Sequence, residues 1–381
     1  GATLASAANP DALVDTCSRE NVCWTMDAAV AGLAAFHLTG DLALWRRSLE
    51  LVAEDIDASG VPRSVVPSDS ACTLPDQAML WAWSVAQHFA MSADDAWAKL
   101  QVDPLSRLLA WCEASVTSED RYVPPSWCWH WVDWAPLEKR AYAAPINALL
   151  ALAARETHIL GAALRSRGLV DQAGKLHQRL TGGFRGFLHD GGTLDHLAPG
   201  VPVPFDNNAT FHHRGPALAH TLHGHVLAWR AGVAPATILD RAAALLAAKP
   251  DVAHCGPGML ALLLTPLCQH GHAATVLDHL RHLTAPIIAA GQPTWPEELR
   301  WPQKHNTAHG WGATLATVLV EGVLGLTPAL PGWRAIRFTP VSAPTGDLDY
   351  ELDTPAGTVR VERHGERWTC TPPPGVEVVA D

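Results

Sequence analysis

Residues 15–27 read DTCSRENVCWTMD, and this stretch decides how the rest of the chain is interpreted. It gathers three carboxylates, an arginine and a tryptophan directly before an apolar run with helical periodicity that begins at Ala28. A second stretch of the same kind, residues 294–301 with the sequence TWPEELRW, lies far downstream and also precedes an expected helix. Two acidic clusters set among indoles therefore come from distant parts of one chain.

This pairing of acids with tryptophans is typical of enzymes that hydrolyse glycosidic bonds. That reaction needs a proton donor and a base on opposite faces of a sugar, and the sugar ring stacks on aromatic side chains. Glu20, close to Trp24 and two cysteines, is the candidate general acid, because partial desolvation would raise its pKa and keep it protonated. Glu297 is the candidate general base, since an ionised carboxylate in a loop can activate water. The residues alone leave a second interpretation open, in which Glu20 and Asp27 interact with a helix N-terminus.

The composition bounds the class of protein. The 381 residues, 48% hydrophobic and 17% charged, can form one large or two unequal domains. The net charge of −11 argues against nucleic acid or an anionic membrane surface as a partner. No stretch approaches the roughly eighteen uncharged apolar residues of a membrane span, and the N-terminus lacks the regions of a signal peptide. The cysteines form no C-x-x-C pair and have apolar neighbours, which indicates buried free thiols and a cytoplasmic protein.

Apolar residues at i, i+3, i+4 and i+7 predict a mainly α-helical domain over residues 1–327. The expected helices are 27–39, 42–56, 76–90, 104–117, 141–167, 169–182, 216–231, 236–248, 257–270, 273–289 and 309–325. Short turns pair them and no motif repeats at a fixed period, so a closed α/α barrel is favoured over a solenoid. Period-two patterns at 333–339, 348–352 and 358–363 predict a small antiparallel β-domain over residues 328–381, packed on the helices.

Two long loops, 119–140 and 191–215, are expected to gather at one end of the barrel and form a pocket. The first contains WCWHWVDW at residues 127–134, which could be a short strand with one indole face buried. At least one of these tryptophans is expected in the pocket, and Asp133 lies between two of them.

The remaining polar candidates point to sugar hydroxyls and not to a metal. Asp15 and Asp27 are expected to accept hydrogen bonds from hydroxyls, although Asp27 could equally be a helix cap. His309 opens the last expected helix, where a lowered pKa would make it a neutral hydrogen-bond partner. His220 and His223 have no acid or cysteine at zinc-binding spacing, so no metal and no cofactor is predicted.

Five motifs, in order along the chain, resemble those of the α-L-rhamnosidases of glycoside hydrolase family 78, in the six-hairpin glycosidase superfamily. Residues 15–27 resemble the family's Asp-Cys-Pro-Gln-Arg-Glu…Gly-Trp…Gly-Asp signature, with the acids, the arginine and the tryptophan in place. Residues 294–297 resemble its Thr-x-Trp-Glu motif, residues 309–311 its Cys-His-Gly-Trp-Ser motif, and residues 131–134 its Gly-Asp-Trp loop. Residues 323–340 resemble the link into the family's C-terminal β-domain.

The resemblance implies an (α/α)6 barrel and an inverting exo-glycosidase that removes terminal α-L-rhamnosyl or related deoxy-sugar units. Glu20 would be the general acid and Glu297 the general base. The resemblance places Asp15, Arg19, Trp24, Asp27 and His309 in the terminal sugar subsite. Trp131, Asp133, Trp134 and Trp295, which lie in the matching motifs, complete the predicted substrate-binding set.

The chain also departs from the family pattern. Thr16 and Ser18 replace Pro-Gln, and Pro296 replaces the tryptophan before the base. The family's N-terminal β-domains have no counterpart, and the residues before Asp15 are too few for a full first barrel helix. A minimal or N-terminally truncated relative is therefore expected, whose barrel a partner chain or a dimer could complete. Two alternatives stay open: a sugar-binding or assembly protein whose catalysis has decayed, and another reaction, such as a lyase or cyclase, in a reused pocket.

Overall fold

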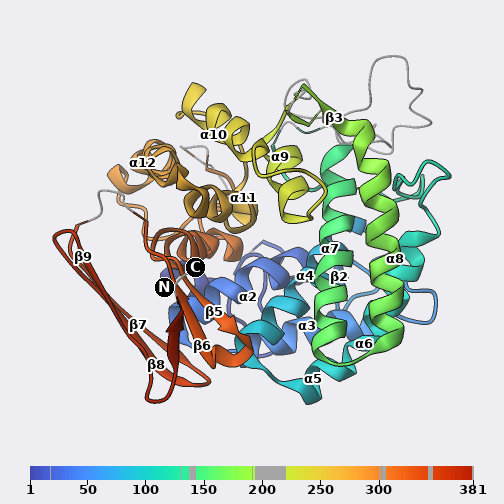
Figure 1. Cartoon of the computed structure of the whole chain (residues 1–381), viewed down its shortest axis with the longest axis horizontal. Helices are drawn as coiled ribbons and strands as arrows, with labels where there is room; N and C mark the ends of the chain where they lie inside the picture. The colour runs from blue at the N-terminus through green and yellow to red at the C-terminus, as the bar shows by residue number, and fades with distance from the viewer. Residues whose placement is uncertain are drawn as a thin grey trace.

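The structure is a computed structural model that describes residues 1–17, 19–128, 130–135, 137, 143–190, 192–193, 220–299, 302, 306–341 and 346–379. It is mainly α-helical, with a smaller β-structured part at its C-terminal end (Figure 1). The predicted fold class, an (α/α)6 barrel followed by a small β-structure, is confirmed.

Within the described residues, six helical segments form the inner ring of the barrel. Each segment contacts the next, and the last contacts the first, which closes the ring. They are α2 (Thr25–Thr39), α4 (Pro75–Ser92), α7 (Ala144–Ala163), α9 (Leu222–Arg230), α11 (Leu260–Leu267) and the run Gly310–Val323, which contains α13 (Leu315–Thr317). All but the last two residues of α2 are buried, so this helix has no polar face to present to solvent.

Amphipathic helices form the outer ring. They are α3 (Ala43–Asp55), α6 (Val102–Glu113), α8 (Arg167–Phe184), α10 (Ile238–Ala248) and α12 (Ala273–Ala289). In α3, Trp45, Leu49 and Val52 lie on one buried face at the spacing that the sequence predicted. Two short helices were not predicted: α5 (Asp95–Leu100), and α1 (Ala2–Ala7), which packs against the start of the Gly310–Val323 run. The expected helices that begin at 141 and 216 begin outside the described residues.

One described segment, Pro257–Ala289, is long and apolar enough to cross a membrane by length and composition. It joins the 3-10 turn Pro257–Met259, α11, the turn Cys268–His272 and α12, and 67% of its most apolar window is buried inside the protein. The backbone breaks at Gly271, whose φ is 87°. The segment therefore forms an inner and an outer helix of the barrel.

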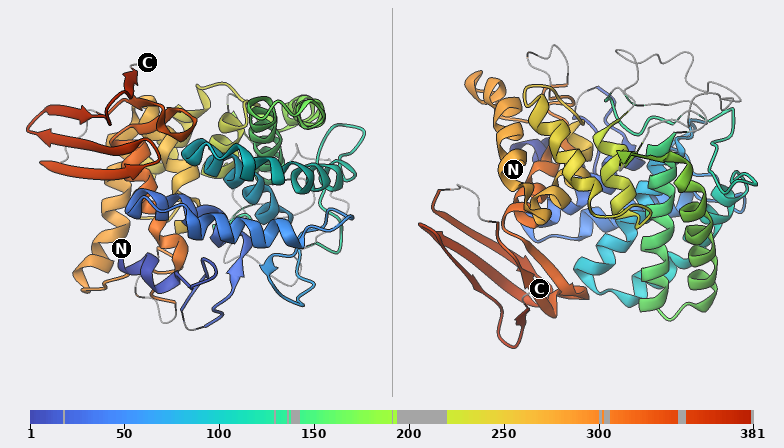
Figure 2. Two further views of the ribbon diagram at one scale, coloured as in Figure 1. Left: turned by 90° about the horizontal axis from the view of Figure 1, so that it is seen from below. Right: turned by 45° about the horizontal axis from the view of Figure 1, so that its top comes forward.

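The strands after Leu326 form two small sheets that lie to one side of the helices (Figures 1 and 2). One sheet contains β5 (Leu326–Leu330), β6 (Ala335–Phe338) and β10 (Glu377–Val379), and the other contains β7 (Leu348–Thr354), β8 (Gly357–His364) and β9 (Arg367–Thr371). Only β6, β7 and β8 were predicted, and β10 pairs with β6 in parallel. The Tyr350 hydroxyl donates to the carbonyl of His37 over 2.7 Å, so this part packs on the barrel as expected. The domain boundary at residue 327 stays a prediction.

Two strand pairs lie outside these sheets. β1 (Cys23–Trp24) pairs with β2 (Val65–Val66), and β3 (Leu188–His189) pairs with β4 (Gly192–Thr193). The β1–β2 pair sets Trp24 opposite Val65 and thereby joins the segment before α2 to the loop before α4.

The contact between α2 and α3 provides a test of how the two helices pack. A Cβ atom at Gly32 would overlap the indole ring of Trp45, whereas a Cβ at Gly168 in α8 would meet no atom within 4 Å. We expect Gly32→Ala to lower the free energy of unfolding by about 3 kcal/mol or more, because the buried indole cannot move away. Gly168→Ala should leave it unchanged or raise it by up to about 1 kcal/mol. Urea unfolding of both variants measures the difference, and equal effects would contradict this packing.

Candidate active site

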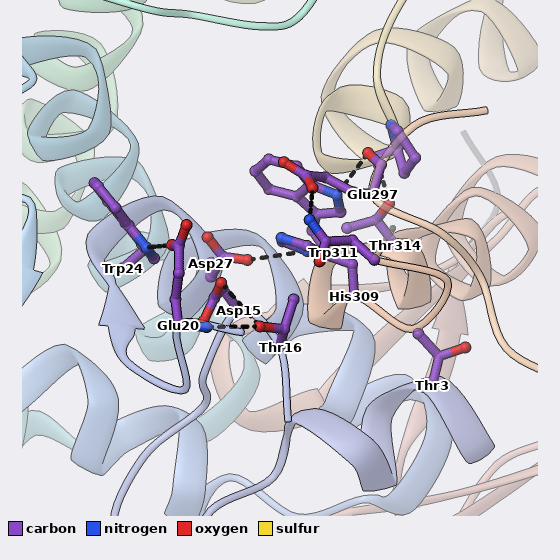
Figure 3. Close-up of polar contacts among 12 residues, drawn as sticks. Thr3, Asp15, Thr16, Glu20, Trp24, Asp27, Glu297, His309, Trp311 and Thr314 are labelled. Carbon is purple, nitrogen blue, oxygen red and sulfur yellow. Dashed lines mark hydrogen bonds and ion pairs between the residues drawn. The ribbon is translucent and has the colours of Figure 1, made fainter. Parts of the chain in front are cut away.

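A cavity of about 260 Å³ lies at the end of the barrel where the inner helices begin. It brings together nine of the eleven side chains predicted for the site: Asp15, Arg19, Glu20, Trp24, Asp27, Trp131, Trp134, Glu297 and His309. Figure 3 shows Glu20 and Trp24 on one side, Glu297 and Trp311 on the other, and Asp27 and His309 between them. The two acidic clusters, far apart in the sequence, thus form walls of one cavity.

Glu20 stands at the open side of the cavity. Its side chain is 33% exposed, so its surroundings cover it only in part. Trp24 Nε1 donates a hydrogen bond to Glu20 Oε2 over 2.5 Å, and Arg19 Nη2 lies 2.9 Å from Glu20 Oε1. Both carboxylate oxygens therefore accept from donors, and neither interacts with a helix N-terminus.

Glu297 lies across the cavity and is held more tightly. Its side chain is 14% exposed, and the amide of Asn306 donates to Glu297 Oε2. The backbone N–H of Glu297 donates to Asn306 over 3.0 Å, and Trp311 Nε1 donates to the carbonyl of Glu297 over 3.0 Å. These bonds hold both the backbone and the carboxylate of Glu297, which lines the cavity.

A backbone hydrogen bond connects the two walls, and a second one lies within the 294–311 wall. The N–H of Gly310 donates to the carbonyl of Asp15 over 2.8 Å, and the N–H of His309 donates to the carbonyl of Trp295 over 3.0 Å. A Cβ atom at Gly310 would stand 2.8 Å from the carbonyl oxygen of Val14, closer than such atoms pack. The approach of the 294–311 region to the 15–27 region thus depends on a glycine at this position.

The floor of the cavity contains two buried acids. Asp15 and Asp27 are each 2% exposed. Burial raises the pKa of Asp15 to about 6, and the charge of Glu20 adds to that shift. Burial also raises the pKa of Asp27 well above its ordinary value, and the charges of Asp15 and Glu297 reinforce it. Trp24 is the N-cap of α2, so the expectation that Asp27 is the cap is wrong. Asp27 lies in the first turn of the helix, where an interaction with the helix N-terminus stays open.

His309 faces Asp27, with 3.4 Å between His309 Nδ1 and Asp27 Oδ1. Burial lowers the pKa of His309 to about 3, with a smaller contribution from Arg19, so the ring is neutral at physiological pH. The sequence predicted the neutral form but attributed it to the helix terminus. The His309 ring stacks on Trp311 at 4.1 Å, and Trp311 stacks on Trp131 at 5.5 Å and 10°. A column of three flat rings therefore lines one side of the cavity.

Two predicted sugar contacts, Asp133 and Trp295, lie outside the cavity lining. Asp133 Oδ2 is 2.7 Å from His223 Nε2 and accepts from the N–H of Gly256 over 2.8 Å, which ties the tryptophan loop to α9 and to the turn before α11. Trp295 does not line the cavity. Its backbone N–H donates to the hydroxyl of Thr3, in α1, over 2.8 Å. Both residues hold lining residues in place.

A second buried carboxylate supports the same loop. Asp76, in the first turn of α4, accepts hydrogen bonds from the backbone N–H groups of Trp131 and Val132 over 3.2 and 2.7 Å. Val132 has a φ of 57°, and the described residues 130–135 form no strand, so the strand considered for residues 127–134 is not found there.

The structure adds three lining residues that were not in the predicted set: Leu74, Gln77 and Trp311. Leu74 and Gln77 lie at the start of α4, where a sequence pattern shows only an ordinary helix. Gln77 is 6% exposed, and its side-chain oxygen has no hydrogen-bond partner in the part of the chain that the structure describes. Trp311 belongs to a motif that the sequence singled out, although its role was not assigned.

Three further predictions concern the cysteines, metal binding and the second long loop. All eight cysteines are free, and five of them are buried. Among the residues that the structure describes, no group of three or more His, Cys, Asp or Glu side chains converges on one point. Most of the second long loop, 191–215, lies outside the described residues.

The buried state of Asp15 predicts a pH-dependent stability. Its pKa rises from 3.8 to about 6 on folding, so its contribution to stability is complete below pH 3.8 and is lost as the pH rises through 6. We expect Asp15→Asn to be more stable than the parent protein by about 1 to 3 kcal/mol at pH 8 and nearly equal to it at pH 4. Thermal unfolding at both pH values measures this. Asp11→Asn, at an exposed position of the same segment, should show no such trend, and a pH-independent effect of Asp15→Asn would contradict the burial argument.

Comparisons with known proteins identify the fold. No protein-family model and no curated protein matches the sequence. The GH78 family rhamnosidase of Bacillus sp. GL1 has a TM-score of 0.82 and 18% identity, over 100% of this chain and 40% of that one. The Streptomyces avermitilis α-L-rhamnosidase complexed with L-rhamnose has a TM-score of 0.76 and 16% identity, over 96% and 36%. A Klebsiella oxytoca rhamnosidase with rhamnose bound has a TM-score of 0.61 and 16% identity, over 79% and 58%.

This chain spans less than two thirds of the length of each of these proteins. At these low sequence identities, the similarity establishes the fold alone. The chain has a glycoside hydrolase fold, the (α/α)6 barrel with C-terminal β-structure of the GH78 α-L-rhamnosidases.

Proposed function

We propose that the protein is an inverting exo-glycosidase that hydrolyses terminal α-L-rhamnosyl or related deoxy-sugar units. The observation that carries this proposal is a shared contact of the two candidate catalytic carboxylates. Arg19 Nη2 lies 2.9 Å from Glu20 Oε1 and 3.7 Å from Glu297 Oε2. A carboxylate pair that faces one cavity from opposite walls is what glycoside hydrolysis requires.

The shared nitrogen limits the distance between the carboxylates. The two oxygens cannot be further apart than the sum of the two contacts. This upper limit touches the lower end of the roughly 6.5–9.5 Å range of inverting enzymes and also includes the roughly 5–5.5 Å of retaining enzymes, so the proposed inversion requires Arg19 to move and the carboxylates to separate. The guanidinium of Arg19 occupies the space between them. Its side chain is 48% exposed, so it can move aside for a sugar and a water molecule without breaking buried packing.

The lining suits a deoxy-sugar. Trp24, Trp131 and Trp134 bring indole surface to the cavity that can pack against the C–H groups of a ring, and Trp311 supports Trp131 by stacking on it. Gln77 places at the cavity a buried oxygen that has no hydrogen-bond partner among the described residues, and Asp27 and His309 face each other there over 3.4 Å, so hydroxyl groups can bond to all three. Leu74 offers an apolar contact for a methyl group. Two of the similar structures contain rhamnose, which supports this class of sugar.

In the proposed reaction, Glu20 donates a proton to the glycosidic oxygen while Glu297 removes one from the attacking water. Both oxygens of Glu20 are acceptors in the free protein. Glu20 therefore becomes a donor only after one of these contacts is released, and the exposed Arg19 is the partner that a sugar can replace. The indole of Trp24 then keeps Glu20 oriented.

A sugar-binding protein without hydrolysis is the second candidate function. The same contacts at Glu20 favour it, because a carboxylate that keeps both donors binds hydroxyls but supplies no proton. Measurable binding of L-rhamnose with no hydrolysis of any rhamnoside would establish this candidate. Apolar side chains in place of the polar sugar contacts would favour the lyase or cyclase alternative, whereas the polar residues Asp15, Asp27 and His309 all line the cavity.

Replacing either proposed catalytic carboxylate tests the reaction. We expect Glu20→Gln and Glu297→Gln each to lower kcat for 4-nitrophenyl α-L-rhamnoside by about 10²- to 10⁴-fold, since a positioned acid or base typically contributes that much. Proton NMR of the first product formed should show inversion of the anomeric configuration.

The neighbouring Glu298, which lines a separate small hollow, provides the matched control. Glu298→Gln should keep kcat within about twofold of the parent value, because it removes no proton-transfer group. Unchanged hydrolysis in Glu20→Gln and in Glu297→Gln would overturn the proposed mechanism.

Gln77 tests the assignment of the sugar subsite. Gln77→Leu keeps the approximate size of the side chain but removes its hydrogen bond, so we expect the Kd for L-rhamnose to rise by about tenfold or more. Gln101 is also buried, at 3% exposure, with an unpartnered side-chain oxygen, and it is not part of the cavity lining. Gln101→Leu should therefore leave the Kd unchanged in isothermal titration calorimetry, and equal effects of the two substitutions would refute the subsite.

A further inference from the structure

A second hollow, of about 530 Å³, lies beside the first. Its lining includes an exposed indole and several polar groups: Asp55, Asp57, Ser59, Arg63, Thr73 and Trp127. Trp127 is 62% exposed, the most exposed tryptophan among the large apolar side chains of the described chain. Trp111 in α6 supports it from below, with ring centroids 6.5 Å apart. An indole held in place but open to solvent is a platform for a flat, partly apolar ligand.

The two hollows open at the same end of the barrel. The first lies where the inner helices α2 and α4 begin. The second lies where the outer helix α3 ends, at Asp55. Because α3 follows α2 through a short turn and runs antiparallel to it, the end of α3 lies near the beginning of α2.

Three chain segments run from one hollow into the other. Trp24 lines the first hollow and pairs with Val65, two residues from Arg63 in the second. Leu74 follows Thr73 directly, and Trp131 lies four positions after Trp127 in the sequence. One member of each pair lines each hollow. A ligand that extends from the first hollow therefore reaches the second along these segments.

The walls of the second hollow are preorganised. Arg63 is fixed by an ion pair and hydrogen bonds to Asp55, whose side chain is 4% exposed, and by a bond to the carbonyl of Ser68. Asp57 accepts from the N–H of Ser59 over 2.7 Å, which fixes the next turn of the loop. Carboxylates predominate over the single guanidinium, so the hollow disfavours anionic ligands and suits neutral hydroxyl groups.

We infer that the second hollow binds a neutral sugar ring in the leaving group of the substrate, with Trp127 as its stacking platform. This inference rests on the proposed function, because the first hollow must hold the terminal sugar. It makes the substrate class a rhamnosylated saccharide. A small aryl rhamnoside would fill the first hollow only.

Calorimetry on the full chain with Glu297→Gln, which prevents turnover, tests the inference. The ligands are L-rhamnose and two rhamnosyl-glucose disaccharides of different linkage, rutinose and neohesperidose. We expect at least one disaccharide to bind about fivefold or more tightly than L-rhamnose, because stacking on an indole adds to the affinity. Adding Trp127→Ala should remove this advantage while the Kd for L-rhamnose stays the same, and Trp127→Phe should retain part of it.

Each outcome decides between the proposals. Equal affinities for L-rhamnose and both disaccharides, or an advantage that survives Trp127→Ala, would overturn the second site and leave the proposed function intact. Absence of binding by all three sugars would overturn the proposed function, and the second site with it. Leu100→Ala, at an apolar position that is 70% exposed on α5, controls for the loss of surface apolar area and should change none of the affinities.

Discussion

The hydrogen bond from the N–H of Gly310 to the carbonyl of Asp15 is the contact on which the site depends. It joins two segments almost three hundred residues apart, one with Glu20 and the other following Glu297. The approach is so close that a side chain at Gly310 would meet both Val14 and Ala7. Because the inner ring closes where α13 contacts α2, closure of the barrel and alignment of the two carboxylates are the same event.

This arrangement divides the charged groups of the cavity into a floor and a rim. Asp15, Asp27 and His309 are buried at the floor, where burial favours the neutral form of each. Arg19 and Glu20 lie at the rim, partly exposed and paired with each other. The floor can thus offer hydrogen bonds to hydroxyls without placing several charges in one small volume, and the charged rim remains free to rearrange when a ligand enters.

Much of this was predictable from the sequence, and the failures share a cause. Helical periodicity located the barrel helices, and acids set among indoles identified Glu20 and Glu297. The short α5 has too few turns to show a period. Asp133 was expected to bind sugar because the sequence reveals its tryptophan neighbours but not its partner His223, ninety positions away. Gln77 has no local signature, and the exposure of Glu20 depends on how the loop turns in space.

Arg19 couples the rim to the reaction. One nitrogen contacts both carboxylates, so in the proposed reaction the free protein holds the acid and the base together through a cation that must leave before either acts on a sugar. A sugar that enters replaces an exposed ion pair, which is worth little in water, with buried hydrogen bonds to Asp27, His309 and Gln77. The exchange favours binding only when the sugar satisfies those buried groups. Specificity and the release of Glu20 are therefore consequences of the same step.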